Sequence, residues 1–346
     1  MKTTKLLQIL SVLLLLLTVS CTTDFEEIIP PISYNNSIII SNEGGYDKNN
    51  SSVNAISKDL SYGATDIYKS ANDQASLGDI LQSIGFNGNK AYLVVNNSNK
   101  IVIVDRTTFK KVGEITNQIH QPRYIAFTND NIYVTNHDYS GEKYVSIYKI
   151  SDLSFVKKIT LTDAAQRAVT ANGNIFVENA SDGFGNKIAY IKGTDNSLQS
   201  YITLPNGNLN KIVSYNSKVY AIASGNTDSY IYEISNDGNI TATTILTGIP
   251  NANKLEIANN KYYFTSSNKV YAMDMETTVV PTAPLFSVTN VNQYSTLYGF
   301  NVVDGKIFTS EANGFTANST ISVYSLTGSL LKTFDGGIGT NGFYAN

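Results

Sequence analysis

The sequence predicts an all-β fold, a seven-bladed β-propeller of four-stranded blades, from three observations. A hairpin unit recurs with a spacing of roughly 41 to 45 residues, which is typical of propeller blades. Tyr, Phe, Ile, Val and Thr dominate the periodic segments, and these residues favour strands. Seven first strands balance seven second strands if the C-terminal segment joins the first blade. The alternative is an open solenoid, but no segment resembles a polar capping repeat.

The composition indicates a folded chain and excludes some classes of binding partner. The 346 residues are 42% hydrophobic and 15% charged, which is typical of globular proteins. With 25 basic against 28 acidic residues, the chain lacks the clustered positive charge that nucleic acid requires. One Cys and two His exclude internal disulfides and argue against a Cys-rich or multi-His metal site. We therefore expect no nucleic-acid partner, no metal and no other cofactor.

The N-terminus predicts an export signal. Lys2 and Lys5 precede a mostly apolar run, Leu6–Val19, which is shorter than the roughly 20 residues needed to span a bilayer. A cleaved signal peptide therefore fits better than a membrane-spanning helix. We expect residues 1–20 to be the signal, residues 21–36 a lipidated Cys with its tether, and residues 37–346 the propeller domain.

The segment Thr18-Val19-Ser20-Cys21 resembles a bacterial lipobox, with Thr18 where that pattern usually has Leu. The resemblance implies that Cys21, the only Cys of the chain, carries a lipid anchor. The alternative is an ordinary cleaved signal with a free Cys beside the cut. The acidic residues Asp24, Glu26 and Glu27 resemble the surface-export signal of Bacteroidota-type lipoproteins. This implies an outer-membrane protein that faces the cell surface.

Each repeat contains a turn that is followed two residues later by an aromatic residue. Asn, Asp and Gly in these turns suit the positive φ of tight hairpins. The turns are centred on residues 89, 130, 173, 217, 260 and 305, and the aromatic residues are Tyr92, Tyr133, Phe176, Tyr220, Tyr263 and Phe308.

The four strands of a blade are clearest in one repeat. From the channel outwards we expect Gln82–Phe86, Ala91–Val95, Lys100–Asp105 and Lys111–Ile115. The first blade begins at its second strand, Ser37–Asn42. We expect the C-terminal segment, residues 336–346, to supply the missing innermost strand. Pairing the two ends of the chain would close the ring and remove exposed sheet edges.

The segment Tyr133-Val134-Thr135-Asn136 reads YVTN, and the repeat that contains it resembles the YVTN, or YncE-like, propeller repeat. The block Gly88–Ile115 is similar to the same family. Together with the lipobox, the chain resembles the secreted seven-bladed propeller lipoproteins of Bacteroidota. Some similar proteins capture corrinoids beside an outer-membrane transporter, so the resemblance implies fold and secretion and suggests a corrinoid as one candidate ligand.

One face of the predicted ring carries long loops. In this strand order, the loops between second and third strands share a face with the loops that join blades. Four loops of the first kind are long, whereas the turns of the opposite face are tight. They span residues 42–50, 136–143, 179–187 and 311–320. Variable loops on a rigid scaffold often carry function, so we expect this face to bind the ligand. The alternative is that the loop lengths vary without functional consequence.

The innermost strands are predicted to begin at the channel with polar residues. These are Gln82, Arg123, Arg167, Lys211, Lys254 and Tyr298. Four cations in consecutive blades could attract an anion, with Arg giving bidentate contacts. Alternatively, they pair with acids such as Glu43, Glu178 and Glu311, or remain solvated. A register error of one residue would turn each side chain to the other face.

The candidate ligand-binding residues combine these strand starts with the loop face. They are Arg123, Asn136, His137, Tyr139, Arg167, Glu178, Lys211, Lys254, Tyr298 and Glu311. His120 and His137 could bind a ligand edge, although solvated loop histidines are the simpler interpretation. Loop aromatic residues could offer flat contacts to a ligand or pack under their own loops. They are Tyr46, Tyr139, Phe184, Tyr294 and Phe315.

The sequence favours binding over catalysis. It has no Gly-x-Ser-x-Gly elbow, no phosphate-binding Gly-rich loop and no HExxH motif. A carboxylate pair such as Glu178 with Glu311 could serve acid–base chemistry only if the fold brought it together. We predict a lipid-anchored surface propeller that binds a small molecule, anionic or a corrinoid, and that has an outer-membrane transporter as its candidate partner. The alternatives are a protein-interaction or adhesion module and an extracellular lyase or hydrolase.

Overall fold

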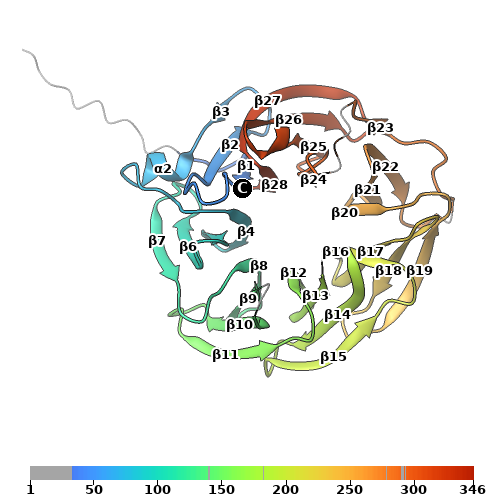
Figure 1. Ribbon diagram of the computed structural model, residues 1–346, viewed down its shortest axis with the longest axis horizontal. Helices are drawn as coiled ribbons and strands as arrows, with labels where there is room; N and C mark the ends of the chain where they lie inside the picture. Colours follow the sequence, from blue (N-terminus) through green and yellow to red (C-terminus); the bar gives the residue numbers. More distant parts are fainter. Residues whose placement is uncertain (1–32, 139–140, 182, 278, 290–291, 293) are drawn as a thin grey trace, which may run out of the picture. The chain divides into compact units, whose positions relative to one another are not determined.

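The computed structural model describes residues 33–346 apart from 139–140, 182, 278, 290–291 and 293. Seven antiparallel sheets of four strands form a ring around a central channel (Figure 1). We number these sheets as blades 1 to 7 in chain order, from the sheet that contains β1. The predicted all-β, seven-bladed propeller is confirmed.

The innermost strand of each blade lines the channel and touches the innermost strand of the next blade. In chain order of their blades, these strands are β28 (Thr340–Ala345), β4 (Leu81–Asn87), β8 (Pro122–Phe127), β12 (Ala165–Ala171), β16 (Asn208–Tyr215), β20 (Ala252–Ala258) and β24 (Phe300–Val303).

The second strands are the most buried, because each is flanked by strands on both edges and by neighbouring blades on both faces. They are β1 (Ser37–Asn42), β5 (Lys90–Val95), β9 (Asn131–His137), β13 (Asn174–Ser181), β17 (Lys218–Ser224), β21 (Lys261–Ser266) and β25 (Lys306–Glu311).

The third and outer strands complete each blade. The third strands are β2 (Ser52–Ser57), β6 (Lys100–Asp105), β10 (Lys143–Lys149), β14 (Phe184–Lys192), β18 (Ser229–Ile234), β22 (Lys269–Asp274) and β26 (Asn318–Ser325). The outer strands are β3 (Gly63–Ala64), β7 (Lys111–Ile115), β11 (Phe155–Thr160), β15 (Ser197–Thr203), β19 (Ile240–Leu246), β23 (Phe286–Ser287) and β27 (Leu330–Ile338).

Most of the tight turns between first and second strands have the positive φ that their residues predicted, but the prediction is wrong for the turn at residues 129–131 in blade 3, where no residue has positive φ. Asn172 and Gly173 have φ values of 47° and 77°, and Asp304 and Gly305 have φ values of 50° and 69°. Positive φ at both central positions matches the right-handed twist of the flanking strands. The recurring Asn, Asp and Gly residues therefore set the hairpin that repeats around the ring.

The ring closes through the C-terminus. Strand β28 pairs antiparallel with β1 from Ile38 opposite Ala345 to Asn42 opposite Thr340. The predicted closure is confirmed, but its expected start at residue 336 is wrong, because residues 336–338 belong to the outer strand β27. The chain turns sharply at Gly339, where φ is 62°, and this separates the two strands.

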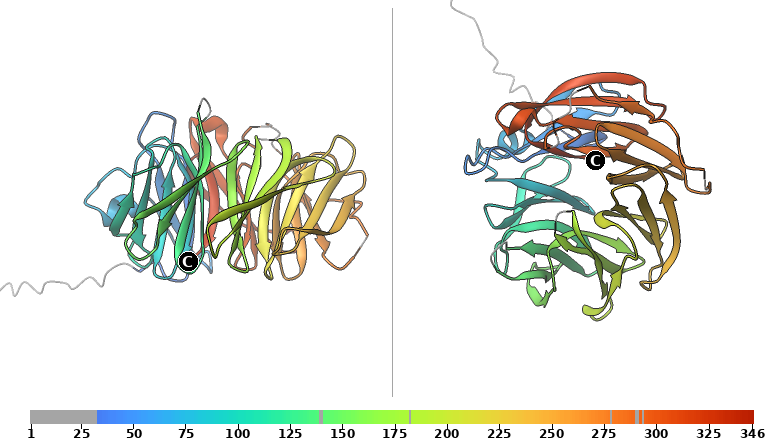
Figure 2. Two further views of the ribbon diagram at one scale, coloured as in Figure 1. Left: turned by 90° about the horizontal axis from the view of Figure 1, so that it is seen from below. Right: turned by 45° about the vertical axis from the view of Figure 1, so that its right-hand side comes forward.

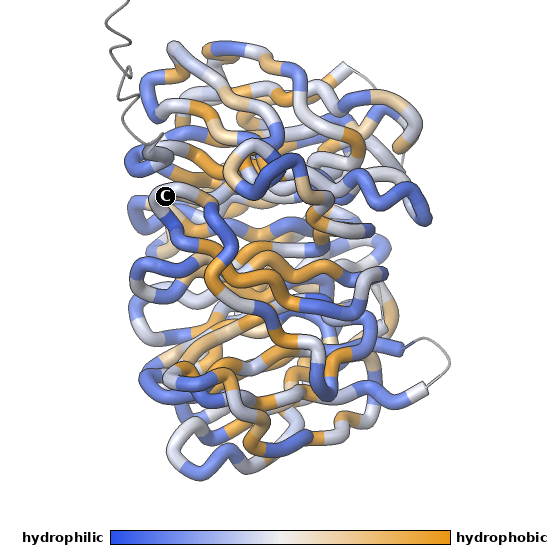
Figure 3. The backbone as a smooth tube through the Cα atoms, turned by 90° about the vertical axis from the view of Figure 1, so that its left-hand side faces the viewer, coloured by the Kyte–Doolittle hydropathy of each residue, from blue (hydrophilic) through white to orange (hydrophobic). Residues whose placement is uncertain are grey.

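The recurring aromatic residues form the core between blades. Tyr92, Tyr133 and Phe176 have no exposed surface, and Tyr220, Tyr263 and Phe308 are at most 4% exposed. They stand on the second strands, where both faces of the sheet are covered. Figure 3 shows hydrophobic residues along the strands and hydrophilic residues concentrated at the turns and loops. Burial of this hydrophobic surface is the main stabilising contribution between blades.

Helical structure is short in the described part. Helix α2 (Ile67–Ala71) connects blades 1 and 2, and Asp66 caps it by accepting a hydrogen bond from the backbone N of Lys69. A 3₁₀ turn, η1 (Asn313–Phe315), lies in the β25–β26 loop. Across the described residues, no helix has the length and hydrophobicity needed to cross a membrane.

The two faces of the ring differ. We call the side where the innermost strands begin the mouth face, and the side that carries the tight turns the turn face. Strand β1 begins on the turn face, and there the backbone N of Asn346 donates to the carbonyl of Ser37 at 2.9 Å. Nearby, the backbone N of Tyr34 donates to the carbonyl of Thr107 at 2.8 Å. The first described residues and the C-terminus (Figure 2) therefore share the turn face.

We predict that deleting residues 340–346 abolishes cooperative folding, because β1 and the neighbouring innermost strands lose their partner. Circular dichroism during thermal unfolding would show a broadened transition at a lower temperature. As a control, a chain with Thr340–Asn346 moved to precede Asn35 through a short linker should recover a sharp transition. A truncated chain as stable as the wild type would contradict the role of β28.

Candidate functional site

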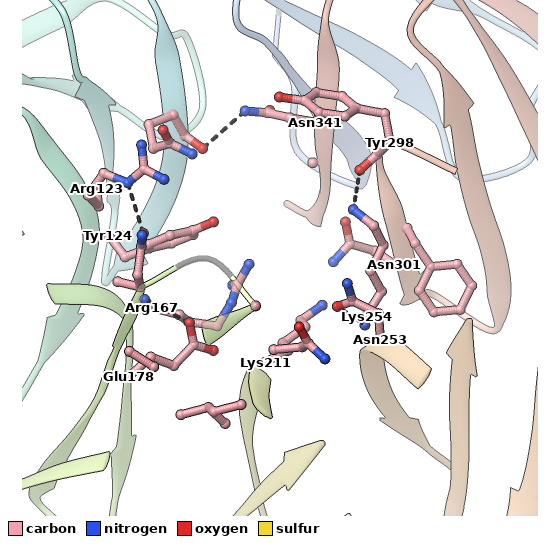
Figure 4. Close-up of a pocket in the computed structure, with 18 of the residues that line it drawn as sticks. Arg123, Tyr124, Arg167, Glu178, Lys211, Asn253, Lys254, Tyr298, Asn301 and Asn341 are labelled. Atoms are coloured by element: carbon pink, nitrogen blue, oxygen red, sulfur yellow. Dashed lines mark hydrogen bonds between the residues drawn. The ribbon is translucent and has the colours of Figure 1, made fainter. Parts of the chain in front are cut away.

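A cavity of about 570 Å³ opens at the channel mouth. Its volume lies within the range of small-molecule sites in proteins. All seven blades contribute to its lining, from Asn341 in blade 1 and Gln82 in blade 2 to Tyr298 in blade 7. Figure 4 shows the labelled side chains converging on this space from several blades. It is the natural candidate site of the molecule.

β-Bulges direct side chains into the cavity. Strand pairing shifts register at the start of six of the seven innermost strands. In β8, two residues, Arg123 and Tyr124, oppose the single residue Thr135. A bulge breaks the alternation of side chains, so both members of such a pair line the cavity. The pair Gln166 and Arg167 in β12 does the same.

In blades 3 and 7, a hydroxyl on the second strand bonds the backbone near the start of the innermost strand. Thr135 Oγ1 accepts from the backbone N of Tyr124 at 2.9 Å, and Ser310 Oγ accepts from Gly299 at 2.7 Å. Blade 4 has Glu178 in the equivalent place, two residues after its recurring aromatic residue. Glu178 Oε2 accepts from the backbone N of Arg167 at 3.2 Å. This substitution places a carboxylate in the cavity lining.

Glu178 is only 7% exposed. Its Oε1 accepts from the backbone N of Ile212 in blade 5 at 2.6 Å. Burial raises the pKa of Glu178 to about 7, although Arg167 and the two backbone donors oppose the shift. The charge of the cavity therefore changes near neutral pH.

Lys211 is the most buried of the four lining cations and has a carboxylate partner. Its Nζ lies 2.6 Å from Glu256 Oε1, and the same oxygen accepts from Asn301 Nδ2 at 2.8 Å. Burial lowers the pKa of Lys211, while Glu256 raises it. The pair spans blades 5 and 6, so Lys211 is largely neutralised within the protein.

Lys254 lies in the bulge of β20, where its own φ is 52°. Its Nζ donates to the carbonyl of Tyr298 at 2.6 Å and lies 5.7 Å from the centre of the Tyr298 ring. Burial lowers the pKa of Lys254 to about 8, and nearby Lys211 and Arg167 lower it further. Lys254 is thus charged at neutral pH in a site that opposes its charge.

Arg123 and Arg167 complete the cationic side of the cavity. Arg123 Nε donates to Gln166 Oε1 at 2.9 Å, and the Arg167 guanidinium lies 4.4 Å from the centre of the Tyr124 ring. Among the described residues, neither arginine nor Lys254 lies within salt-bridge distance of a carboxylate. Charges held away from water without a close counter-ion are unfavourable.

Glu43 is the second carboxylate of the lining. Its Oε1 accepts from Tyr298 Oη at 2.7 Å and from Asn341 Nδ2 at 2.9 Å. Burial raises the pKa of Glu43. Four cations thus share the lining with two carboxylates whose burial favours their neutral forms, and the cavity has an excess of positive charge at neutral pH.

The cavity contains most of the predicted site residues. They are Arg123, Arg167, Glu178, Lys211, Lys254 and Tyr298, together with Gln82. Asn136 and Glu311 do not line it. Asn136 is fully buried and bonds Ser146 within its own blade. The proposed carboxylate pair of Glu178 with Glu311 is therefore not assembled in the cavity.

The histidines occupy different environments. His137 is only 5% exposed, so the expectation of a solvated loop residue is wrong for it. It lies behind the cavity, with its Nδ1 3.4 Å from Nε2 of the lining residue Gln166. His120 is half exposed beside Asp138.

The predicted site residue Tyr139 lies outside the described residues. Within the described ranges, no three His, Cys, Asp or Glu side chains gather as a metal site would require.

Residues 36–340 match the family described as "Domain of unknown function (DUF5074)". The chain belongs to the DUF5074 family. No curated protein matches the chain. The family shown is therefore DUF5074, and the resemblance to YVTN and YncE-like repeats rests on the repeat motifs alone.

Solved structures with the same fold include several propellers. The crystal structure of a quinonprotein alcohol dehydrogenase-like protein from Bacteroides thetaiotaomicron VPI-5482 aligns with a TM-score of 0.67 and 15% identity, covering 91% of this DUF5074 chain and 79% of the other. The designed protein Ika8 aligns with a TM-score of 0.57 and 13% identity, covering 88% and 86%. Hydrazine synthase from Kuenenia stuttgartiensis aligns with a TM-score of 0.54 and 14% identity. The alignment covers 74% of this chain and 86% of the other. At these identities the similarity extends to the fold alone.

Sequence reasoning missed several lining residues of this DUF5074 propeller. Tyr124, Gln166, Asn210 and Asn253 each adjoin a predicted residue, and the bulges expose both neighbours to the cavity. Asn341 lines the cavity only because the C-terminal strand β28 completes blade 1. Alignment of the repeats would have singled out Glu178, because Thr135, Thr265 and Ser310 occupy the same position in other blades.

We predict that the free energy of unfolding falls as pH rises from about 4.5 to 7. The folded state holds the Glu178 proton more tightly than the unfolded chain does, since its pKa is raised from 4.5 to about 7. The expected decrease is about 2 to 3 kcal/mol. Urea denaturation at several pH values would measure it.

Glu178→Thr tests this assignment. In blade 3 the residue at the same position is Thr135, whose hydroxyl accepts the hydrogen bond from the bulged backbone and has no carboxyl proton to release. The Glu178→Thr variant should remove the part of this pH dependence that Glu178 contributes, leaving the slope that Glu43 contributes through its raised pKa. An unchanged slope in the Thr variant would contradict the assignment to Glu178.

Proposed function

We propose that this chain is a binding protein that takes up a small anionic molecule at the channel mouth. The observation that carries the proposal is the convergence of Arg123, Arg167, Lys211 and Lys254 from four consecutive blades on one cavity. Only Lys211 has a carboxylate partner among the described residues. An anionic group between the other three would supply the missing counter-charge, with charge-assisted hydrogen bonds from the arginines.

The polar lining narrows the class of ligand. Amide side chains of Gln82, Asn210, Asn253 and Asn301 surround the cations, and they suit hydroxyl or amide groups. An acidic sugar fits this combination of an anion with polar substituents. A corrinoid offers a phosphodiester and amide side chains, but its size would leave most of the molecule outside a cavity of 570 Å³. Both remain candidates with the same anchoring chemistry.

We further propose that the protein is anchored to the outer membrane through Cys21 and faces the cell surface. The lipobox-like segment and the acidic residues after it support this proposal. The described chain begins on the turn face, beside Thr107 and the C-terminus. An outer-membrane transporter is the protein partner that we propose for the anchored propeller.

We predict that one or more acidic ligands raise the unfolding temperature of the full chain by a few degrees at saturation. A suitable panel contains glucuronate, an acidic tetrasaccharide, nucleotides, inorganic phosphate and cyanocobalamin, with glucose as the neutral control. Arg123→Ala should weaken binding of a stabilising ligand about 10- to 100-fold, because one charge-assisted contact is lost.

The exposed Lys149→Ala on the turn face is the control for net charge and should leave affinity unchanged. Affinity should also be lower at pH 8.5 than at pH 6.5, since Lys254 loses its proton near 8 and Glu178 gains charge near 7. The proposal fails if no member of the panel binds the wild type, or if Arg123→Ala and Lys149→Ala behave alike.

We predict that Cys21→Ala prevents lipid attachment and releases the protein from the membrane fraction. Metabolic labelling with a fatty-acid analogue and fractionation of the native host would measure both. Protease treatment of intact cells should degrade the wild-type protein if it faces the cell surface. Lipid labelling that persists in the Ala variant would contradict the assignment of Cys21.

A further inference from the structure

Three aromatic side chains on loops of the mouth face are in contact with solvent. Tyr46, Phe184 and Tyr294 are 68%, 75% and 71% exposed. We call these three residues the aromatic rim. They contrast with Phe315, another loop aromatic residue, whose ring packs at 4.8 Å against the ring of Tyr298. Of the two alternatives for the loop aromatic residues, packing within the protein applies to Phe315, although its partner Tyr298 belongs to another loop, and exposure to solvent applies to the rim.

Each rim residue belongs to a loop that also contributes to the cavity. Tyr46 follows the lining residue Glu43 in the β1–β2 loop, and Tyr294 precedes Tyr298 in the connection to β24. Phe184 adjoins Gly183 at the tip of the β13–β14 hairpin. The three exposed rings therefore stand on loops that reach the cationic cavity.

The rim is distributed on opposite sides of the ring. Blades 7 and 1 lie side by side in the ring (Figure 1), and Tyr294 and Tyr46 belong to the segments that lead into β24 of blade 7 and β2 of blade 1. Phe184 belongs to blade 4 on the far side of the ring. A ligand confined to the cavity would reach none of these faces well, whereas one that projects from it could contact both sides.

Exposed aromatic surface alone does not define a site, since single exposed hydrophobic residues are common on proteins. Tyr62, in the β2–β3 turn on the turn face, is also 62% exposed. Here, however, the three exposed rings belong to loops that all contribute residues to one charged cavity. Aromatic faces contribute contact area with little conformational cost, and they stack on the apolar faces of ring systems.

We infer that the ligand is a ring-bearing anion larger than the cavity. Its anionic group occupies the space between Arg123, Arg167 and Lys254, and its rings lie outside on the aromatic rim. This inference rests on the proposed function and extends it from the cavity to the surrounding loops. Sugar rings of an acidic oligosaccharide and the ring of a macrocycle with a pendant phosphate share this chemistry.

The test compares each anionic fragment with the whole molecule that contains it, using the full chain and isothermal titration calorimetry. One arm pairs glucuronate with an acidic tetrasaccharide that contains glucuronate, and the other pairs inorganic phosphate with cyanocobalamin. We expect the whole ligand of one arm to bind at least 10-fold more tightly than its fragment, and that arm identifies the source of the rings.

Rim variants test where the added affinity arises. Tyr46→Ala, Phe184→Ala and Tyr294→Ala should each weaken the whole ligand about 3- to 10-fold and leave the fragment unchanged. Tyr62→Ala is the matched control, because it removes an equally exposed ring from the other face. Arg123→Ala should weaken fragment and whole ligand alike.

The outcomes separate this inference from the proposed function. If the fragment binds and depends on Arg123, while whole ligands gain nothing or the rim variants equal Tyr62→Ala, the rim inference is overturned and the proposed function stands. If neither fragment nor whole ligand binds the wild type, both are overturned.

Discussion

The pairing of β28 with β1 is the constraint on which the rest of the structure depends. It joins segments about 300 residues apart in the chain, and only then do seven innermost strands surround a common axis. Closure stabilises the fold in two ways. No blade keeps an open strand edge on the channel side, and the hydrophobic core between blades 7 and 1 is covered. The packing of Phe308 against Phe343, with ring centres 5.3 Å apart, lies at this closure. The channel mouth exists as a cavity because the ring is complete.

Residues of the mouth also tie neighbouring blades together. Arg123 of blade 3 bonds Gln166 of blade 4, and Glu178 of blade 4 accepts from the backbone of blade 5. Further ties continue through the Lys211–Glu256 pair and from Lys254 to the Tyr298 carbonyl. The same side chains therefore stabilise the ring and define the cavity. An anionic ligand would act on both, because it would relieve repulsion between cations that the ring holds close together.

The fold and the site carry different amounts of functional information. The compared structures share the fold of this chain at only 13% to 15% identity. Fold alone does not indicate a ligand. The cationic cavity, the substitution of Glu178 for a hydroxyl residue, and the aromatic rim are particular to this chain's own residues. They are the features on which the proposed anion binding depends.

The sequence by itself determined the repeat, the strands, the tight turns and the closure of the ring. These follow from local patterns: Asn, Asp and Gly at positive φ, and an aromatic residue two positions later on each second strand. Sequence also placed Arg123, Arg167, Lys211, Lys254 and Tyr298 at the channel, because all lie near the starts of innermost strands. Only the tertiary structure decided which neighbours share the cavity, since bulges at the strand starts break the alternation that sequence reasoning assumes. It also decided that Lys211 is paired while Lys254 is not, because ion pairing depends on how closely adjacent blades approach.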